Sequence, residues 1–195
     1  MRTAEVKRKT KETNISLQLG LEGKGDIHIQ TGCGFLDHML ELFAAHGGFD
    51  LNIKCDGDTK VDDHHTVEDV GITLGEAFLK ALGDKKGIYR YGNITLPMDE
   101  VLVVCALDLS GRSYLNMDVS IPSQKVGTFD TELVYEFMMA MARKLEMNLH
   151  FILLAGGNSH HIIEAMFKAL GRALAQGVAI DPKNMDKVPS TKGVL

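Results

Sequence analysis

The pattern His-His-x-x-Glu occurs twice in this chain, each time where a helix is expected to begin. Its two copies are His64, His65 and Glu68, and then His160, His161 and Glu164. Each copy follows a helical pattern, near 34–46 or 130–145, and a short strand pattern, 49–55 or 148–154. This recurrence indicates an internally duplicated fold of the α/β (α+β) class, with a sheet packed on helices in each half.

The helices that precede the two motifs align with His38 opposite Glu136. His38 lies 26 residues before His64, and Glu136 lies 24 residues before His160. A difference of two residues fits a change in one loop. We therefore predict a single domain, residues 1–195, made of tandem repeats at approximately 1–92 and 93–180, with a C-terminal tail at 181–195.

The remaining elements follow from hydrophobic periodicity. Alternating apolar and polar residues predict strands at 3–9 and 14–21 and a third strand around Ile27 and Ile29. Three more strands are expected within 87–120. The motif-bearing helices should run from Asp62 or Asp63 to about 82, and from about 159 to 176.

Composition narrows the classes of protein. The formal net charge of −5 argues against nucleic acid as a main partner. The N-terminal residues are polar and lack a secretory signal, and no apolar stretch approaches the roughly 18 residues of a membrane span. Three scattered cysteines without CxxC spacing favour a reducing cytoplasm over a disulfide framework or a thiolate zinc site.

The two motifs favour metal binding. Residues four apart share one face of a helix, so His64 and Glu68 should point together, while the adjacent histidine points about 100° away. Two such helix starts could serve two metal ions, and imidazole with carboxylate suits Mn, Fe, Co, Ni or Zn. One pair alone could be two polar residues at a helix start. His-x-x-x-Glu also differs from the His-Glu-x-x-His of zinc proteases.

Other residues have weaker signals. His38 lies in the apolar run GFLDHMLELF and by itself suggests a core histidine, but its repeat partner Glu136 favours metal ligation. Glu12, between two predicted strands, is most simply a solvated loop charge. Four basic residues could meet an anionic substrate or could be surface charges: Arg90, Arg112, Lys168 and Lys192.

Five separated segments together resemble the imidazoleglycerol-phosphate dehydratase family, and they keep its order and spacing from about residue 3 to the C-terminus. They are GFLDHM, DDHHTVED, DLSGR, NSHHIIEAMFKALGRAL and STKGVL. The resemblance implies helices packed between two mixed sheets, a ribosomal protein S5 domain 2-like fold. It implies dehydration of D-erythro-imidazole glycerol phosphate to imidazole acetol phosphate in histidine biosynthesis. Two Mn²⁺ ions per subunit would stabilise an imidazolate intermediate.

Site roles follow from the same resemblance. It implies metal ligation by His38, His64, His65, Glu68, Glu136, His160, His161 and Glu164, although many members carry a histidine at the place of Glu136. It implies catalytic roles for Glu12, Glu68, Asp99 and Glu164. It implies substrate phosphate binding by Arg90, Arg112, Lys168, Ser190 and Lys192, so the tail 181–195 would bind substrate.

The resemblance also implies trimers that assemble into cages of 24 subunits, with active sites at subunit contacts. Two other functions stay open from the residues alone. One is a noncatalytic scaffold assembled by metal ions, which would need neither an acid/base such as Glu12 nor a phosphate clamp. The other is a dinuclear metallohydrolase, which would release phosphate from esters, whereas a dehydratase would not.

Overall fold

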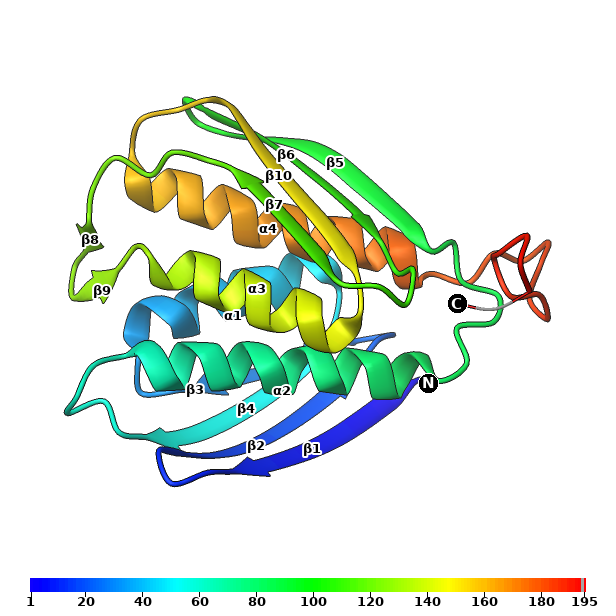
Figure 1. The fold of residues 1–195 in the computed structure, drawn as a ribbon, viewed down its shortest axis with the longest axis horizontal. Helices are drawn as coiled ribbons and strands as arrows, with labels where there is room; N and C mark the ends of the chain where they lie inside the picture. The colour runs from blue at the N-terminus through cyan, green and yellow to red at the C-terminus, as the bar shows by residue number, and fades with distance from the viewer. Residues whose placement is uncertain (194) are drawn as a thin grey trace.

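Two four-stranded sheets enclose a double layer of helices in the computed structural model, which describes residues 1–193 and 195 (Figure 1). The first sheet has the order β1-β2-β4-β3, with β1 (Thr3–Lys9), β2 (Thr13–Gly20), β3 (Ile27–Gln30) and β4 (Asp50–Gly57). The second has the order β5-β6-β10-β7, with β5 (Tyr91–Met98), β6 (Val101–Asp108), β7 (Tyr114–Asp118) and β10 (Asn148–Ala155). In each sheet the last two strands in this order pair in parallel, and the other neighbours pair antiparallel.

Four helices fill the space between the sheets: α1 (Gly34–Gly47), α2 (His64–Leu82), α3 (Leu133–Leu145) and α4 (Ser159–Val178). The first two cover the first sheet, and the last two cover the second. Across the middle, α2 packs on α3 and α1 packs on α4. Each half of the chain therefore contacts the other through both of its helices.

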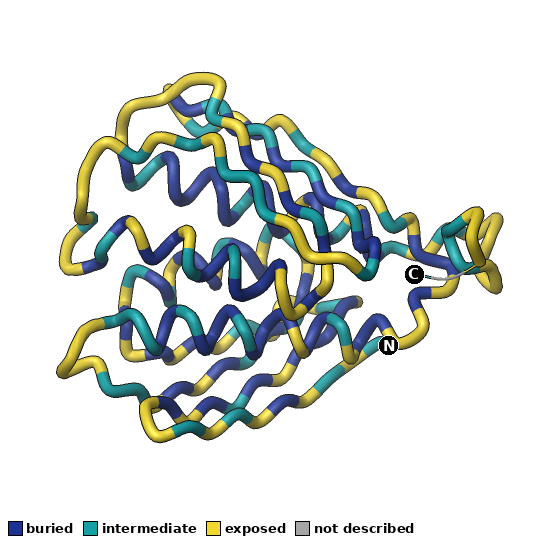
Figure 2. The backbone as a smooth tube through the Cα atoms, viewed as in Figure 1, coloured by how far each residue is buried: buried dark blue, intermediate teal, exposed yellow. Residues whose placement is uncertain are grey.

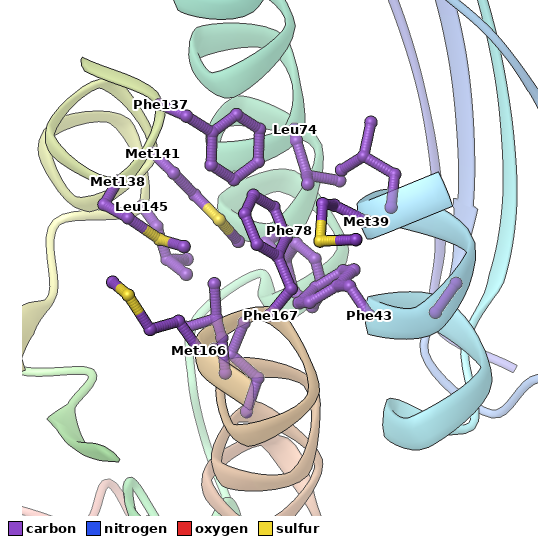
Figure 3. Packing of buried hydrophobic residues seen from close by; sticks show 14 of the residues in the cluster. Met39, Phe43, Leu74, Phe78, Phe137, Met138, Met141, Leu145, Met166 and Phe167 are labelled. Carbon is purple, nitrogen blue, oxygen red and sulfur yellow. The ribbon is translucent and has the colours of Figure 1, made fainter. Parts of the chain in front are cut away.

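The core lies between the helices and on the inner face of each sheet (Figures 2 and 3). Phe43 of α1 and Phe78 of α2 are buried with ring centroids 6.0 Å apart. Phe137 of α3 and Phe167 of α4 are buried with centroids 5.1 Å apart. Burying one such side chain stabilises the fold by roughly 1.5–3 kcal/mol. These buried rings therefore help to hold the four helices together.

The two halves match beyond their strand order. Gly48 after α1 and Glu146 after α3 both adopt the left-handed conformation, and these caps are 98 residues apart, as are His38 and Glu136. The predicted fold class, an internally duplicated α/β unit with helices between two mixed sheets, is confirmed. The repeat boundaries at 92 and 180 stay a prediction.

The predicted helices and strands are present, with ends within about three residues of those expected. The periodic pattern missed one hairpin, β8 (Lys125–Val126) with β9 (Phe129–Asp130), because strands of two residues are too short to show alternation. Within the part of the chain that the structure describes, no helix is both long enough and apolar enough to cross a bilayer.

Candidate functional site

Both histidine pairs lie at helix starts on the same end of the molecule, opposite the C-terminal tail (Figure 1). Asp62 accepts a 2.8 Å hydrogen bond from the backbone N–H of His64. Asn158 accepts from the backbone N–H groups of His160 and His161, at 2.9 and 3.3 Å. These acceptors satisfy backbone N–H groups that a helix start leaves unpaired. They therefore fix the helix starts that carry the histidines.

The two pairs have nearly the same geometry. The ring centroids of His64 and His65 are 6.1 Å apart with planes at 84°, and those of His160 and His161 are 6.2 Å apart at 83°. Adjacent imidazoles therefore face different directions, as the helical spacing predicts. The first and second histidine of each pair consequently meet different partners.

The first histidine of the second pair joins a cluster of three donor groups from two helices. One ligand atom each from His38 on α1, His160 and Glu164 on α4 lies within 4.8 Å of the others. The Nε2 of His160 is 3.3 Å from Glu164 Oε2, and the rings of His38 and His160 have centroids 6.2 Å apart. Two imidazoles and a carboxylate are a donor set that suits a divalent first-row metal ion.

Lys168 lies beside this cluster, one helical turn beyond Glu164. Its Nζ is 2.5 Å from Glu164 Oε1 and 3.4 Å from the sulfur of Met98. Burial raises the pKa of Glu164, but the hydrogen bond and charge of Lys168 outweigh burial, so the net pKa is lowered. Glu164 is therefore held as a carboxylate, the form that can bind a cation.

The second histidine of this pair faces the β5–β6 turn. His161 Nδ1 lies 3.0 Å from Glu100 Oε2 and 3.9 Å from Asp99 Oδ2. The hydrogen bond with Glu100 raises the pKa of His161. Asp99, predicted as a catalytic residue, is therefore near a predicted ligand. Sequence reasoning missed Glu100, although it directly precedes β6 just as Glu12 directly precedes β2.

The first pair has a similar arrangement. His65 Nδ1 lies 3.0 Å from Asp58 Oδ2, and this hydrogen bond raises the pKa of His65. The backbone N–H of Asp58 donates to the carbonyl of Glu12, at 3.1 Å. The fold thus brings the hairpin that carries Glu12 to the first histidine pair, which the sequence alone did not indicate.

Three other predicted ligands do not gather in the same way. Among the described residues, no group of three ligand atoms within 4.8 Å of one another includes His64, Glu68 or Glu136. Glu68 and Glu136 are each partly exposed, on the facing helices α2 and α3. Their metal ligation stays a prediction.

The predicted phosphate-binding residues are not brought together within one chain. Arg90 binds both carboxylate oxygens of Asp108, at 2.6 and 3.0 Å, and donates to the carbonyl of Pro189, next to Ser190. The backbone N–H of Arg90 donates to Gly177, which lies 17 residues beyond His160 in α4, or about 25 Å along a helix. Lys168 lies at the metal-donor end instead.

Arg112 and Lys192 belong to the same distant end as Arg90. The carbonyl of Arg112 accepts from the side chain of Asn148, the first residue of β10, at 2.8 Å. Lys192 is exposed in the tail, which Figure 1 shows at the end opposite the helix starts. The predicted metal donors and four of the five predicted phosphate ligands thus occupy opposite ends of the molecule.

Comparison with known proteins identifies the family. A family model described as imidazoleglycerol-phosphate dehydratase matches residues 31–174. The chain belongs to the imidazoleglycerol-phosphate dehydratase family. The imidazoleglycerol-phosphate dehydratases of Heliobacterium modesticaldum and Desulforamulus reducens are 60% and 57% identical to it, over 195 and 194 residues. These alignments cover 100% of this chain and 100% and 98% of the relatives.

Solved imidazoleglycerol-phosphate dehydratase structures share the fold. The Staphylococcus aureus structure has a TM-score of 0.84 and 42% identity, covering 92% of this chain and 99% of its own. The Pyrococcus furiosus structure has a TM-score of 0.84 and 41% identity, covering 97% and 100%. Membership of the imidazoleglycerol-phosphate dehydratase family makes this protein an enzyme, a hydro-lyase of histidine biosynthesis.

Proposed function

We propose that the enzyme dehydrates D-erythro-imidazole glycerol phosphate to imidazole acetol phosphate with two Mn²⁺ ions per subunit. The observation that carries the metal dependence is the meeting of His38, His160 and Glu164 from two separate helices. A buried carboxylate that Lys168 keeps ionised beside two imidazoles fits a bound cation.

The ligands proposed for the two ions come from all four helices. They are His38, His64, His65, Glu68, Glu136, His160, His161 and Glu164. Bound Mn²⁺ would supply Lewis-acid stabilisation of the negative charge that develops on the substrate's imidazole ring. This charge matters because no carbonyl neighbours the carbon that loses its proton.

The proton transfers need a carboxylate within hydrogen-bond reach, and we assign this role to Glu12. Its hairpin is tied to Asp58 and so lies next to His65. Glu12 would take the carbon-bound proton, and the substrate hydroxyl would leave with a proton as water. Asp99 is exposed near His161 and is proposed as a second acidic group, with Glu68 and Glu164 supporting the reaction at the metal ligands.

The opposite placement of metal donors and phosphate ligands supports active sites shared between subunits. A small substrate cannot span the roughly 25 Å that separates the two ends along α4. We therefore propose that Arg90, Arg112, Ser190 and Lys192 of one chain complete a site whose metals and Lys168 come from another. The same proposal includes trimers, a cage of 24 subunits, and a cytoplasmic location.

The outer faces of the two sheets support self-association as well. The outward residues of β2 are polar, whereas β6 and β10 expose an apolar stripe: Leu102, Val104, Ile152 and Leu154. Ile152 and Leu154 are 39% and 56% exposed in the single chain. Covering these residues against another copy would remove apolar surface from water.

The test is incubation with imidazole glycerol phosphate and Mn²⁺, followed by detection of the enolisable ketone product. Glu12→Gln should lower turnover by about 10²–10⁴-fold, because acid–base catalysis is lost, and should leave bound Mn²⁺ unchanged. Glu76→Gln, at an exposed position of α2, is the control. Full activity of Glu12→Gln would remove its assigned role.

The same assay separates the other two functions. Release of inorganic phosphate without a ketone would identify a metallohydrolase. Metal binding with neither product would identify a scaffold.

A further inference from the structure

The second histidine of each pair contacts a carboxylate of its own, and nothing in the sequence pattern indicated either contact. Asp58 Oδ2 and Glu100 Oε2 each lie 3.0 Å from a histidine Nδ1, of His65 and His161 respectively. The two acids come from different kinds of segment: Asp58 follows β4, whereas Glu100 lies in the β5–β6 turn. The two halves thus make the same kind of histidine–carboxylate contact, with the carboxylate supplied by non-equivalent segments.

A carboxylate at Nδ1 determines which nitrogen of the ring can bind a metal ion. An ionised carboxylate only accepts hydrogen bonds, so Nδ1 must carry the proton. In the neutral ring the lone pair then resides on Nε2. Carboxylates that accept from metal-binding histidines in this way also fix the orientation of the ring.

Glu100 is itself held at both oxygens. While Oε2 accepts from His161, Oε1 accepts a 3.1 Å hydrogen bond from the backbone N–H of Asn158. The side chain of Asn158 in turn accepts from the backbone of His161. This closed network fixes the carboxylate relative to the start of α4, so the imidazole has little freedom to turn.

Asp58 is anchored in another way. Its backbone N–H donates to the carbonyl of Glu12, and its Oδ1 is buried without a hydrogen-bond partner among the described residues. Leaving a buried carboxylate oxygen unpaired is costly. The fold tolerates this cost at a residue whose other oxygen holds His65.

We propose that Asp58 and Glu100 are positioning residues that hold His65 and His161 with Nε2 free for Mn²⁺, without binding the ion themselves. This inference rests on the proposed function, because it presupposes that the two histidines are ligands. The rival arrangement is an ion bound by Asp99, Glu100 and His161 Nδ1, since one ligand atom from each lies within 4.8 Å of the others.

The test is titration of the metal-free protein with Mn²⁺, with free ion measured by electron paramagnetic resonance. Glu100→Ala and Asp58→Ala should each weaken Mn²⁺ binding by about 10–100-fold at one kind of site, with both ions still bound at saturation. Glu100→Gln should recover much of this loss, because the amide oxygen still accepts from Nδ1. Glu76→Ala is the control, and the melting temperature of the metal-free variants reports folding.

Each outcome decides between the arrangements. Unchanged affinity in a folded Glu100→Ala or Asp58→Ala would overturn the positioning role of that residue. Loss of one whole ion from Glu100→Gln at saturation would show that Glu100 is a ligand. If Glu100→Ala does not fold, Glu100→Gln and Asp58→Ala decide by the same criteria. A wild-type protein that binds no Mn²⁺ would instead refute the proposed function.

Discussion

Asp69 connects three elements through one buried carboxylate. Its Oδ1 accepts from two nitrogens of Arg8 on β1, at 3.0 and 2.8 Å, and its Oδ2 accepts from the hydroxyl of Thr13 on β2, at 2.5 Å. Both strands belong to the hairpin whose turn carries Glu12. The residue next to Glu68 therefore holds the hairpin against α2 and has no need to touch a metal ion.

Replacing Asp69 by Ala should destabilise the fold, because it leaves Arg8 and Thr13 without their partner. We expect a loss of about 2–4 kcal/mol in the free energy of unfolding, discounted because Arg8 is one-third exposed. Urea denaturation measures it. Asp56→Ala, an exposed position on β4, is the control and should change little. Equal stability of the two variants would contradict the bracing role.

At the same scale, the sequence predicted some site residues better than others. The histidine motifs were visible because helical spacing fixes which side chains share a face. Glu12, Asp58 and Glu100 lie in turns, where periodicity carries no information. Their positions depend on how each hairpin folds against a helix start, so only the three-dimensional structure brings them to the imidazoles.

Two glycines set the distance between paired helices. A Cβ on Gly171 of α4 would collide with the backbone carbonyl of Phe43 on α1. A Cβ on Gly75 of α2 would collide with the carbonyl of Met141 on α3. These contacts correspond between the halves, since Met141 follows Phe43 by 98 residues and Gly171 follows Gly75 by 96.

Gly171→Ala should therefore push α1 and α4 apart, which would separate His38 from His160. Overpacking of this kind costs about 1–3 kcal/mol, and thermal unfolding should show a lower melting temperature. Gly34→Ala on α1, where a Cβ meets open space, is the matched control and should be neutral or slightly stabilising. A Gly171→Ala protein as stable as Gly34→Ala would show that the helices can adjust.

The elements were largely predictable because long periodic segments carry a clear signal, as in β2 and α4. The pairing of α1 with α4 and of α2 with α3 was not. Helix pairing depends on which surfaces permit close approach, and a glycine in a helical pattern reads only as a weak helix former. The duplication indicated the two halves but did not indicate that each half packs its helices on the other.

For the whole molecule, the separation of the proposed metal ligands from the C-terminal tail predicts complementation between inactive variants. Glu12→Gln and Lys192→Ala each alter one end and should each have low activity. Unfolded together and reassembled, they should recover part of the wild-type activity, because some sites would combine two intact ends.

Mixing the two variants after separate assembly is the control and should recover nothing. Absence of recovery after joint reassembly, with assembly confirmed by gel filtration, would contradict active sites shared between subunits.

Both motif-bearing helices start at the same end of the molecule, and this has an electrostatic consequence. The start of a helix carries a partial positive charge from its aligned peptide dipoles, so it favours anions and repels cations. Two such starts beside two divalent ions would oppose metal binding. Four carboxylates lie at these starts and offset this field: Asp58, Asp62, Asp99 and Glu100. Part of the negative charge at this end of the molecule would therefore favour cation binding by cancelling the helix dipoles.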